Sequence, residues 1–462
     1  MRKLRLFVIL SLSRQVYERK QRTLSDTAEF RVLKGFVQNG HEVHALMPKE
    51  KGIREEYSYH GIAIHEFKNV RIPRTNGLVS KSLLTLAQRI EELLFVLFSL
   101  KRFSEIVKSC GKPDLVYGYM PLASITTYLI SRLYGIPSIT RLFGAFLYTS
   151  LSSPRDLFLR MGYLELLSFK LPCQYLIITN DGTRGDEAAK RLGVPHERVK
   201  YFMDGADFLE PIEVDTTALR EKLGIPGEVH LLLSVCRLTN WKRVDRIIEA
   251  IPEIARVNKN IKVLIIGEGE ERRNLEFLCD KLDVRDFVVF LGAVTHNRIR
   301  DFMLIADVFV SLYDFTNLSN SSFEAMACGL CVVALNTGAT SQVIKNGVNG
   351  VLIDPPDLKK LPDIINWLLT DDDSRNKLSR KARQYALENF ESWEERVSKE
   401  VNLIESSFNQ ARQDYSTGQT ADPRRILEET GHMIEIKREW KNPFRDGRAT
   451  ARIVKTIKRA KF

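Results

Sequence analysis

The sequence predicts an α/β protein made of two doubly wound halves in series. Short apolar strands alternate with amphipathic helices along most of the chain, a pattern typical of parallel sheets covered by helices. The chain has 462 residues, which is too long for one compact core, so two or three domains are expected. A segment with Pro211 and Pro226 separates the two series of strands and helices, and we interpret it as their connection. A cleft between the halves is the expected ligand site.

The first half opens with a βαβ unit, which implies a parallel sheet. A strand is predicted over residues 4–12, an amphipathic helix over 22–39, and a strand over 41–47 that Pro48 stops. Further elements follow the same alternation. They are helices at 79–108 and 123–134 and strands at 114–117, 138–140, 175–179 and 199–202.

The second half repeats this pattern and ends in helices. Its predicted strands are 230–235, 262–266, 288–291, 307–311, 331–335 and 350–353. The helices predicted between and after them are 244–251, 272–282, 298–305, 323–328, 357–369, 374–390 and 393–410.

The positive charge of the chain is concentrated near its last residue. The net charge is +11, and residues 437–462 hold ten Lys and Arg against Glu439 and Asp446, which leaves +3 for the rest. The basic character therefore belongs mostly to a tail. The first residues, MRKLRLFVILSLSR, imitate a signal peptide, but the short apolar run fits a buried first strand better. No apolar stretch reaches the ~18 residues that a bilayer span requires.

The cysteines do not predict a metal or redox centre. Cys328 and Cys331 form a CxxC across a helix-to-strand junction, and no second CxxC or CxxH accompanies them. We expect reduced thiols in a cytosolic protein. The six cysteines are Cys110, Cys173, Cys236, Cys279, Cys328 and Cys331.

The stretch from Ser311 to Leu335 is the first candidate site. A strand leads into a polar loop, a short helix and a second strand, and a helix that begins there can bind an anion. Glu324 has two interpretations. It is the second member of a capping box with Ser321 as the N-cap, or it is a ligand-binding carboxylate.

Two cations form the second candidate site. Arg237 follows the strand at 230–235, and Lys242 stands where the next helix is expected to start. Two cations across such a loop can converge on a diphosphate; the alternative is a surface arginine and an ordinary helix-start lysine. The nearby Gly267-Glu268-Gly269 is interpreted as a tight turn, because two further glutamates follow and would repel a pyrophosphate.

The order of these motifs resembles glycosyltransferase family 4, whose members have the GT-B fold of two Rossmann-like domains facing a central cleft. The matching stretches are SVCRLTNWKRVDRIIEAI, VLIIGEGEERRNLE, FVVFLGAVTHNRIRDFMLIADVFVSLYD, SFEAMACGLCVVALNTGATSQVI, NGVNGVLIDP, YFMDGADF and ENFESWEERV. The likeness is strong over residues 170–410 and loose over 1–170. It implies an acceptor-binding domain at 1–208 and a nucleotide-sugar-binding domain at 209–388. A helix at 389–412 is expected to cross back to the first domain, and 413–462 is the basic tail.

The resemblance also implies the ligands of the donor. Arg237 and Lys242 would grip the diphosphate, Glu324 would hold the ribose hydroxyls as the second glutamate of a Glu-x7-Glu motif, and Val294 would meet the base. Backbone N–H groups near Leu318, Ser319 and Asn320 would help with the diphosphate. No metal and no cofactor are expected.

Two positions depart from the family's pattern. Thr316, followed by Asn317, stands where the first glutamate usually contacts the donor sugar. Phe143 stands where a histidine is usual. Arg141, two residues earlier, is a candidate cation near the reacting centre, or alternatively the partner of a core carboxylate. No histidine is predicted to be catalytic.

These inferences predict a retaining glycosyltransferase that moves a sugar from a nucleotide-diphosphate sugar to a glycan or lipid-linked acceptor. The basic tail and the apolar run at 93–98 favour a cytoplasmic protein at an anionic membrane surface. The alternative for this run is a core helix with a solvated basic face. One alternative, suggested by Thr316 and Phe143, is a scaffold that binds the nucleotide sugar without transferring it. Another is a sugar-nucleotide epimerase. Nucleic-acid binding is not expected, because the tail lacks interleaved aromatic residues.

Overall fold

The computed structural model describes residues 3–12, 27–49, 56–70, 81–145, 162–210, 215–222 and 224–416. The predicted basic tail lies outside the described residues, except for its first four. The chain separates into two compact units, Met1–Phe408 and Asn409–Phe462, and both sheets belong to the first unit. The domain boundaries proposed from the sequence at 208 and 388 stay predictions.

The first sheet has eight strands in the order β3-β4-β2-β1-β5-β6-β7-β8. Among them only β3 runs antiparallel, to its neighbour β4. The strands are β1 (Arg5–Leu10), β2 (Glu42–Lys49), β3 (Glu56–Tyr59), β4 (Ile62–Lys68), β5 (Leu115–Tyr119), β6 (Ser138–Leu142), β7 (Tyr175–Thr179) and β8 (Val199–Phe202). The helices of this half are α2 (Ala28–Gln38), α3 (Lys81–Cys110), α4 (Pro121–Tyr134), α7 (Gly162–Lys170) and α8 (Gly185–Arg191).

Pro48 does not stop β2, contrary to the sequence prediction. β2 pairs with β1 only as far as Leu46, whereas its pairing with β4 continues through Pro48 and Lys49. Because Pro48 lies beyond the register with β1, its missing N–H breaks no hydrogen bond on that side. The strand therefore ends two residues later than predicted.

The second sheet has six parallel strands in the order β11-β10-β9-β12-β13-β14. The strands are β9 (His230–Val235), β10 (Ile261–Ile266), β11 (Val288–Gly292), β12 (Val308–Ser311), β13 (Cys331–Leu335) and β14 (Val351–Ile353). The helices are α9 (Thr216–Lys222), α10 (Asp245–Val257), α11 (Arg272–Lys281), α12 (His296–Ile305), α13 (Asn320–Ala327), α14 (Leu361–Thr370) and α15 (Asp372–Asn389).

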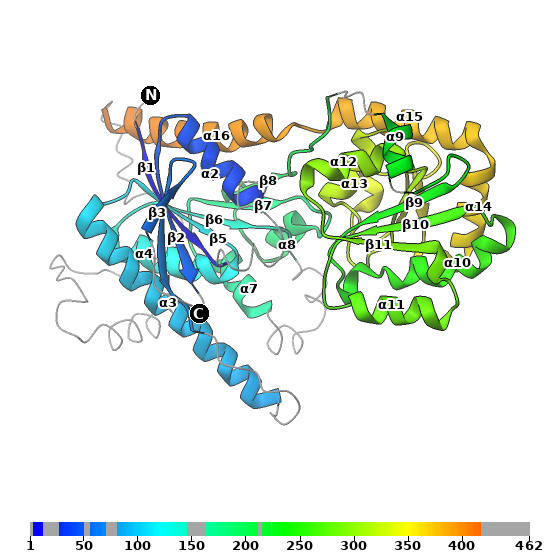
Figure 1. Ribbon diagram of the computed structural model, residues 1–462. Helices are drawn as coiled ribbons and strands as arrows, with labels where there is room; N and C mark the ends of the chain where they lie inside the picture. The colour runs from blue at the N-terminus through cyan, green and yellow to red at the C-terminus, as the bar shows by residue number, and fades with distance from the viewer. Residues whose placement is uncertain are drawn as a thin grey trace. The chain divides into compact units, whose positions relative to one another are not determined.

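This sheet is buried on both faces. Figure 1 shows α10 and α11 on one face and α12 and α13 on the other. Along β9, Leu232 packs with α10 and α11, whereas Leu231 and Leu233 pack with α12, α13 and α15. Burial on both faces explains the continuous apolar runs of these strands. The predicted class, two doubly wound α/β halves, is confirmed.

Helix α16 (Trp393–Ser416) packs against the first sheet as far as the first compact unit extends. Val401 and Ile404 belong to the same apolar cluster as β1 and β2, and Val397 and Phe408 pack on it. The approach to α2 is close, because a Cβ on Gly35 would lie 2.1 Å from Val397 Cγ1. None of the described helices combines the length and the apolar composition that a bilayer crossing needs.

Candidate functional site

The predicted donor residues follow the carboxyl ends of β9, β11 and β12 in the second sheet. Carboxyl ends of parallel strands lie at one edge of a sheet, where open α/β folds bind their ligands. Two contacts join the β9 and β12 loops directly: Asp314 N donates to Trp241 O over 3.1 Å, and Arg246 donates to Asp314 over 2.7 Å. The loop after β12 therefore lies against the Arg237–Lys242 loop and the start of α10.

Lys242 does not begin the next helix. It ends a 3-10 turn, Asn240–Lys242, and α10 begins at Asp245. Its Nζ lies 3.6 Å from the ring centroid of Tyr313 and 4.1 Å from that of Trp241. Rings at these distances attract an ammonium group. The lysine is thus directed toward the end of β12, the neighbouring strand.

Arg237 and Lys242 act electrostatically on the same atom. Burial raises the pKa of the Cys236 thiol, and the positive charges of Lys242 and Arg237 both act to lower it. Arg237 is exposed and Lys242 is half-buried. The convergence of Arg237 and Lys242 on a diphosphate stays a prediction.

The two glycines of the Gly267-Glu268-Gly269 turn permit close packing against this loop. A Cβ on Gly267 would lie 1.8 Å from Cys236 O, and one on Gly269 would lie 2.1 Å from Leu238 O. Leu238 N donates to Glu268 O over 3.0 Å. The turn therefore supports the Arg237 loop from behind, in agreement with its interpretation as a tight turn.

Glu324 is not part of a capping box. The N-cap of α13 is Ser319, whose side chain accepts from Ser322 N, so the prediction of Ser321 as the cap is wrong. Glu324 is the fifth residue of the helix, two positions beyond the third residue, from which a capping-box glutamate reaches back. Its side chain is buried, and its Oε1 lies 2.8 Å from Nε2 of His296.

His296 is a residue of this site that the sequence reasoning missed. It is the first residue of α12 and follows Val294 by two positions in the loop after β11. Its Nε2 also lies 3.6 Å from Asp207 Oδ2, and Asp207 Oδ1 accepts from Arg31 Nη1 over 2.9 Å. The position of the histidine just after a strand's carboxyl end was the available signal.

The protonation of this group reflects both burial and pairing. Burial acts to lower the pKa of His296, but the hydrogen bond with Glu324 and the charges of Glu324 and Asp207 raise it above its usual value overall. Burial raises the pKa of the Glu324 carboxyl, and the contact with His296 acts in the opposite direction. The possible ligand atoms of Asp207, His296 and Glu324 lie within 4.8 Å of one another, a spacing that metal sites also have. In this cluster the guanidinium of Arg31 already pairs with Asp207, so Asp207 has a positively charged partner from the protein itself.

The loop at 316–320 is held by its own hydrogen bonds. Asn317 is fully buried, and its side chain bonds Ser311 Oγ, Tyr313 N and Leu335 O. The N–H of Leu318 donates to Thr316 Oγ1, and that of Ser319 donates to Asn317 O. Asn320 is the first residue of α13, where a backbone N–H has no acceptor within the helix.

Thr316 contacts the loop after β7. Its hydroxyl donates to Asp181 O over 2.8 Å, and a Cβ on Gly182 would lie 2.2 Å from Thr316 Oγ1. The space next to residue 316 is therefore filled by backbone of the first half. This packing gives a physical reason for a small side chain where the family has a glutamate.

Arg141 is fully buried near the carboxyl end of β6. Its guanidinium pairs with Glu400 of α16 and lies 3.5 Å from Asp204. Phe143 lies beside it, with the guanidinium carbon 5.2 Å from the ring centroid. These contacts favour the second of the two interpretations, pairing with a core carboxylate. A catalytic role of Arg141 stays a prediction.

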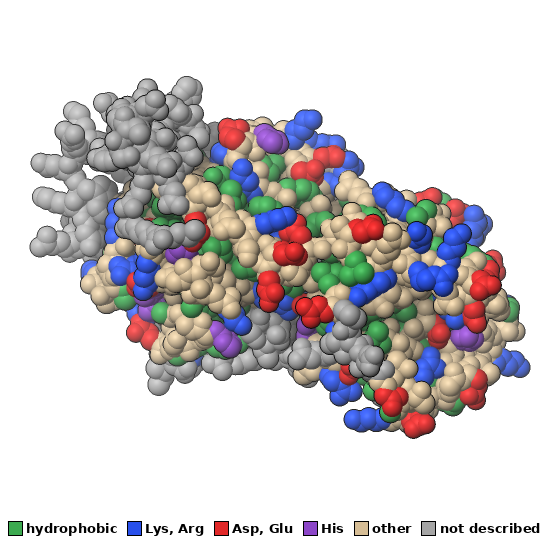
Figure 2. Space-filling view, turned by 90° about the horizontal axis from the view of Figure 1, so that it is seen from above, with side chains coloured by type: hydrophobic (Ala, Val, Ile, Leu, Met, Phe, Trp, Pro, Cys, Tyr) green, Lys and Arg blue, Asp and Glu red, His purple; other side chains and the backbone are tan. Residues whose placement is uncertain are grey.

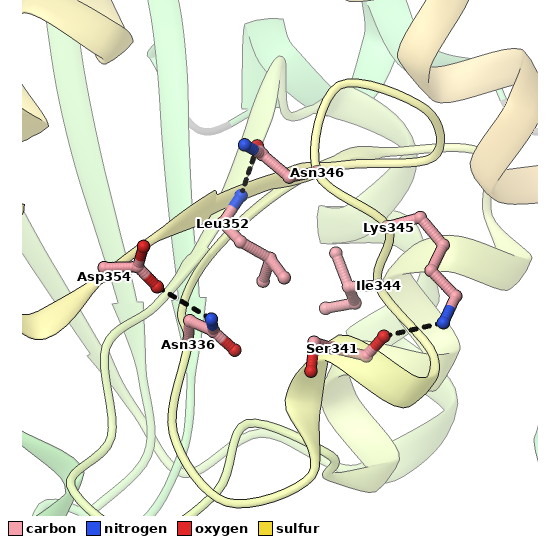
Figure 3. A pocket seen from close by; sticks show the side chains of 7 residues that line it. All are labelled: Asn336, Ser341, Ile344, Lys345, Asn346, Leu352 and Asp354. Carbon is pink, nitrogen blue, oxygen red and sulfur yellow. Dashed lines mark hydrogen bonds between the residues drawn. The ribbon is translucent and has the colours of Figure 1, made fainter.

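A pocket of about 270 Å³ lies in the second half, apart from the predicted residues. Figure 3 shows its polar side chains bonded to near neighbours: Asn336 to Asp354, and Lys345 to the backbone of Ser341. None of the predicted donor ligands lines it, so we assign it no function. The lining residues are Asn336, Ser341, Ile344, Lys345, Asn346, Leu352 and Asp354.

The fold of this chain also occurs in proteins whose structures have been solved. Among solved structures, the chain resembles HepE of Anabaena in complex with UDP and glucose, with a TM-score of 0.64 and 18% identity. The match covers 87% of this chain and 100% of that one. At this identity the likeness concerns the fold, and it confirms the predicted GT-B architecture.

The family follows from sequence comparison. Residues 215–385 match the model of the family described as Glycosyl transferases group 1. The chain is 31% identical over 251 residues to an uncharacterized glycosyltransferase of Methanocaldococcus jannaschii, covering 52% of this chain and 62% of that protein. It is 29% identical over 217 residues to the D-inositol 3-phosphate glycosyltransferase of Xylanimonas cellulosilytica, covering 45% and 51%. Residues 215–385 thus match the group 1 glycosyltransferase family, in agreement with the resemblance seen in the sequence. The matches of the chain span between half and two thirds of the length of these relatives.

Proposed function

We propose that this protein transfers a sugar from a nucleotide-diphosphate sugar to a glycan or lipid-linked acceptor, with retention of the anomeric configuration. One observation carries the proposal. At a single edge of the second sheet, a pair of cations and a helix N-terminus accompany the buried carboxylate of Glu324, in the order that the family's motifs have. The match of residues 215–385 to the group 1 model and a relative named as a D-inositol 3-phosphate glycosyltransferase support it.

The proposed residues suit the charges that develop in such a transfer. The bond between the anomeric carbon and the phosphate oxygen breaks, the acceptor hydroxyl bonds to the same face of the carbon, and its proton passes to the leaving phosphate. Negative charge grows on the diphosphate, where Arg237, Lys242 and the N-terminus of α13 would stabilise it. This course needs no nucleophile from the protein.

The donor site can be tested by thermal shift with UDP, GDP, ADP, CDP and dTDP. A bound nucleotide raises the melting temperature because it binds only the folded state. We expect one of them to raise the melting temperature of the wild type and to lose this effect in Lys242→Ala. Lys377→Ala is the control, because Lys377 is an exposed lysine of α15. An unchanged shift in Lys242→Ala would refute the diphosphate site.

A scaffold that binds nucleotide sugars is the alternative that Thr316 and Phe143 suggest. The two functions separate when the protein is incubated with nucleotide sugars and candidate acceptors. Release of nucleoside diphosphate, with a product of retained configuration by NMR, supports the transferase. Tight binding without hydrolysis or transfer, with every acceptor, supports the scaffold.

We also propose that the protein works in the cytoplasm at an anionic membrane surface. All six cysteines are free, as in a reducing compartment. Leu86, Ile90 and Leu93 follow one another at helical spacing on α3 and are 55%, 42% and 48% exposed. The face of the described residues in Figure 2 carries both signs of charge interspersed. Because residues 437–462 hold +8 of the net charge of +11, the tail is the main source of attraction to anionic lipid in this proposal.

Co-sedimentation with vesicles of phosphatidylcholine and phosphatidylserine tests the membrane proposal. We expect the full chain to bind at physiological salt and residues 1–412 to bind less. Leu86→Asp should weaken the binding that remains without the tail. If neither the full chain nor residues 1–412 sediments with the vesicles, the membrane proposal is wrong.

A further inference from the structure

The Glu324 side chain is 5% exposed, yet as a ribose ligand it has to accept hydrogen bonds. A carboxylate accepts through two oxygens only when it is ionised. Burial opposes ionisation, because the charged form loses its hydration. A buried carboxylate with this task therefore needs a nearby donor, and α13 itself supplies none at this position.

His296 meets this need from a different element. It lies on α12, reached from the end of β11, and its Nε2 is 2.8 Å from Glu324 Oε1. No described residue donates to Glu324 Oε2, so that oxygen is the one available to a ligand. The imidazole of His296 thus contacts Oε1 of Glu324 and leaves Oε2 available to a ligand.

Contacts on its remaining sides hold the histidine in place. Its ring stacks on Phe208, with centroids 5.3 Å apart and an interplanar angle of 22°. Phe208 has a φ of +67°, a left-handed conformation that costs energy for an aromatic residue and brings Asp207 and Phe208 to the same imidazole. Asp207 is paired in turn with Arg31 of α2.

The charged groups that face His296 are few. They are Glu324 of α13, Asp207 of the turn after β8, and Arg31 of α2 behind Asp207. Arg300, one turn further along α12, lies over Phe208, the ring that stacks on His296. Its guanidinium carbon is 5.5 Å from the Phe208 ring centroid. Two carboxylates against a more distant guanidinium favour the imidazolium form.

We propose that His296 is a positioning residue for Glu324. It holds the carboxylate ionised and turned so that Oε2 faces the ribose hydroxyls of a bound nucleotide, while Asp207 and Arg31 hold His296 itself. The inference rests on the proposed role of Glu324 as the ribose ligand. It adds a residue of α12 and two residues of the first half to the machinery that reads the nucleotide.

The test is nucleotide binding by His296→Gln and His296→Ala, measured calorimetrically with UDP, GDP, ADP, CDP and dTDP. His230→Gln is the matched control, because His230 is similarly half-buried, with 29% of its side chain exposed against 24%, and lies 3.8 Å from Asp307. A hydrogen bond to a charged group contributes enough that His296→Ala should weaken binding by roughly 10- to 100-fold. The control should bind like the wild type, and melting temperatures without ligand show that each variant is folded.

The pH dependence separates positioning from a merely structural role. Glutamine keeps a neutral donor but no positive charge, so His296→Gln differs most from the wild type where His296 is protonated. The ratio of dissociation constants, variant over wild type, should be about tenfold near pH 6 and fall as the pH rises toward about 9. Because a ratio is compared, titration of the ligand's own phosphate cancels.

Three results would overturn the positioning role of His296. If the wild type binds a nucleotide and the ratio for His296→Gln is the same at every pH, this inference fails and the donor site stands. If the wild type binds none of the nucleotides, the proposed function and this inference fail together. If EDTA abolishes binding and Mn²⁺ restores it, Asp207, His296 and Glu324 form a cation site and the positioning role is overturned.

Discussion

Replacing Glu400 by glutamine should loosen α16 from the first sheet. Glu400 is fully buried, and its Oε1 accepts from the hydroxyl of Tyr117. Its Oε2 accepts from Arg141 and, over 2.7 Å, from Arg396. Although burial acts to raise it, Arg141 and Arg396 hold the pKa of Glu400 below its ordinary value, so the carboxylate is ionised at neutral pH.

The size of the destabilisation by Glu400→Gln follows from the loss of charge, because glutamine has nearly the same shape as glutamate. In Glu400→Gln the amide oxygen can still face the two guanidinium groups, and the amide nitrogen can donate to the Tyr117 hydroxyl. What is lost is the negative charge between Arg141 and Arg396, with Asp204 left as a weaker partner 3.5 Å from Arg141. Removing one partner of a buried ion pair costs about 3–5 kcal/mol. Glu394→Gln on the same helix is exposed and should cost about 0–1 kcal/mol.

Amide hydrogen exchange along α16, up to Phe408, is the appropriate assay. It reports the free energy of local opening, whereas the two α/β halves need not unfold in one step. The double variant Arg141→Met with Glu400→Gln should recover part of the loss, because it removes the unpaired guanidinium. If Glu400→Gln changes the opening free energy of α16 by less than about 1 kcal/mol, as an exposed pair would, the buried network does not hold the helix.

The same network predicts how stability depends on acid. Because the folded pKa of Glu400 is depressed, its contribution is present above the pKa of an unfolded glutamate, about 4.3, and is lost as the pH falls through the folded pKa. The wild type and Glu400→Gln should therefore converge in acid and diverge toward neutral pH.

Three further substitutions probe the donor edge. Lys242→Met should lower kcat by roughly 10²–10³-fold with unchanged circular dichroism, because it removes a cation from the leaving diphosphate; a loss below about tenfold would argue against that role. Gly267→Ala puts a Cβ 1.8 Å from Cys236 O, so the Arg237 loop has to shift, and both the melting temperature and the nucleotide-induced shift should fall. Thr316→Glu should destabilise by about 1–3 kcal/mol, since Asp181 and Gly182 already fill the space; a stable, more active variant would contradict this packing argument.

Most elements could be predicted because their periodicity is local. The strands at 175–179, 199–202, 230–235 and 331–335 have the predicted bounds, since each is a short apolar run ended by polar or turn-forming residues. Pro48 and Ser321 were misjudged for different reasons. Whether Pro48 ends β2 depends on where the pairing of β2 with β1 ends. The N-cap of α13 depends on which of three nearby serines accepts a hydrogen bond from the first turn of the helix.

The sequence alone determined the fold class, the family resemblance and the residues proposed to bind the diphosphate. These depend on apolar periodicity and on motifs whose members stand close together in the chain. The tertiary structure alone decided that Glu324 contacts His296, that Asp207 and Arg31 stand behind it, and that Arg141 is paired with Glu400. Partners such as Arg141 and Glu400 stand 259 positions apart. Such contacts arise from how helices pack on sheets, and no local pattern of residues encodes that packing.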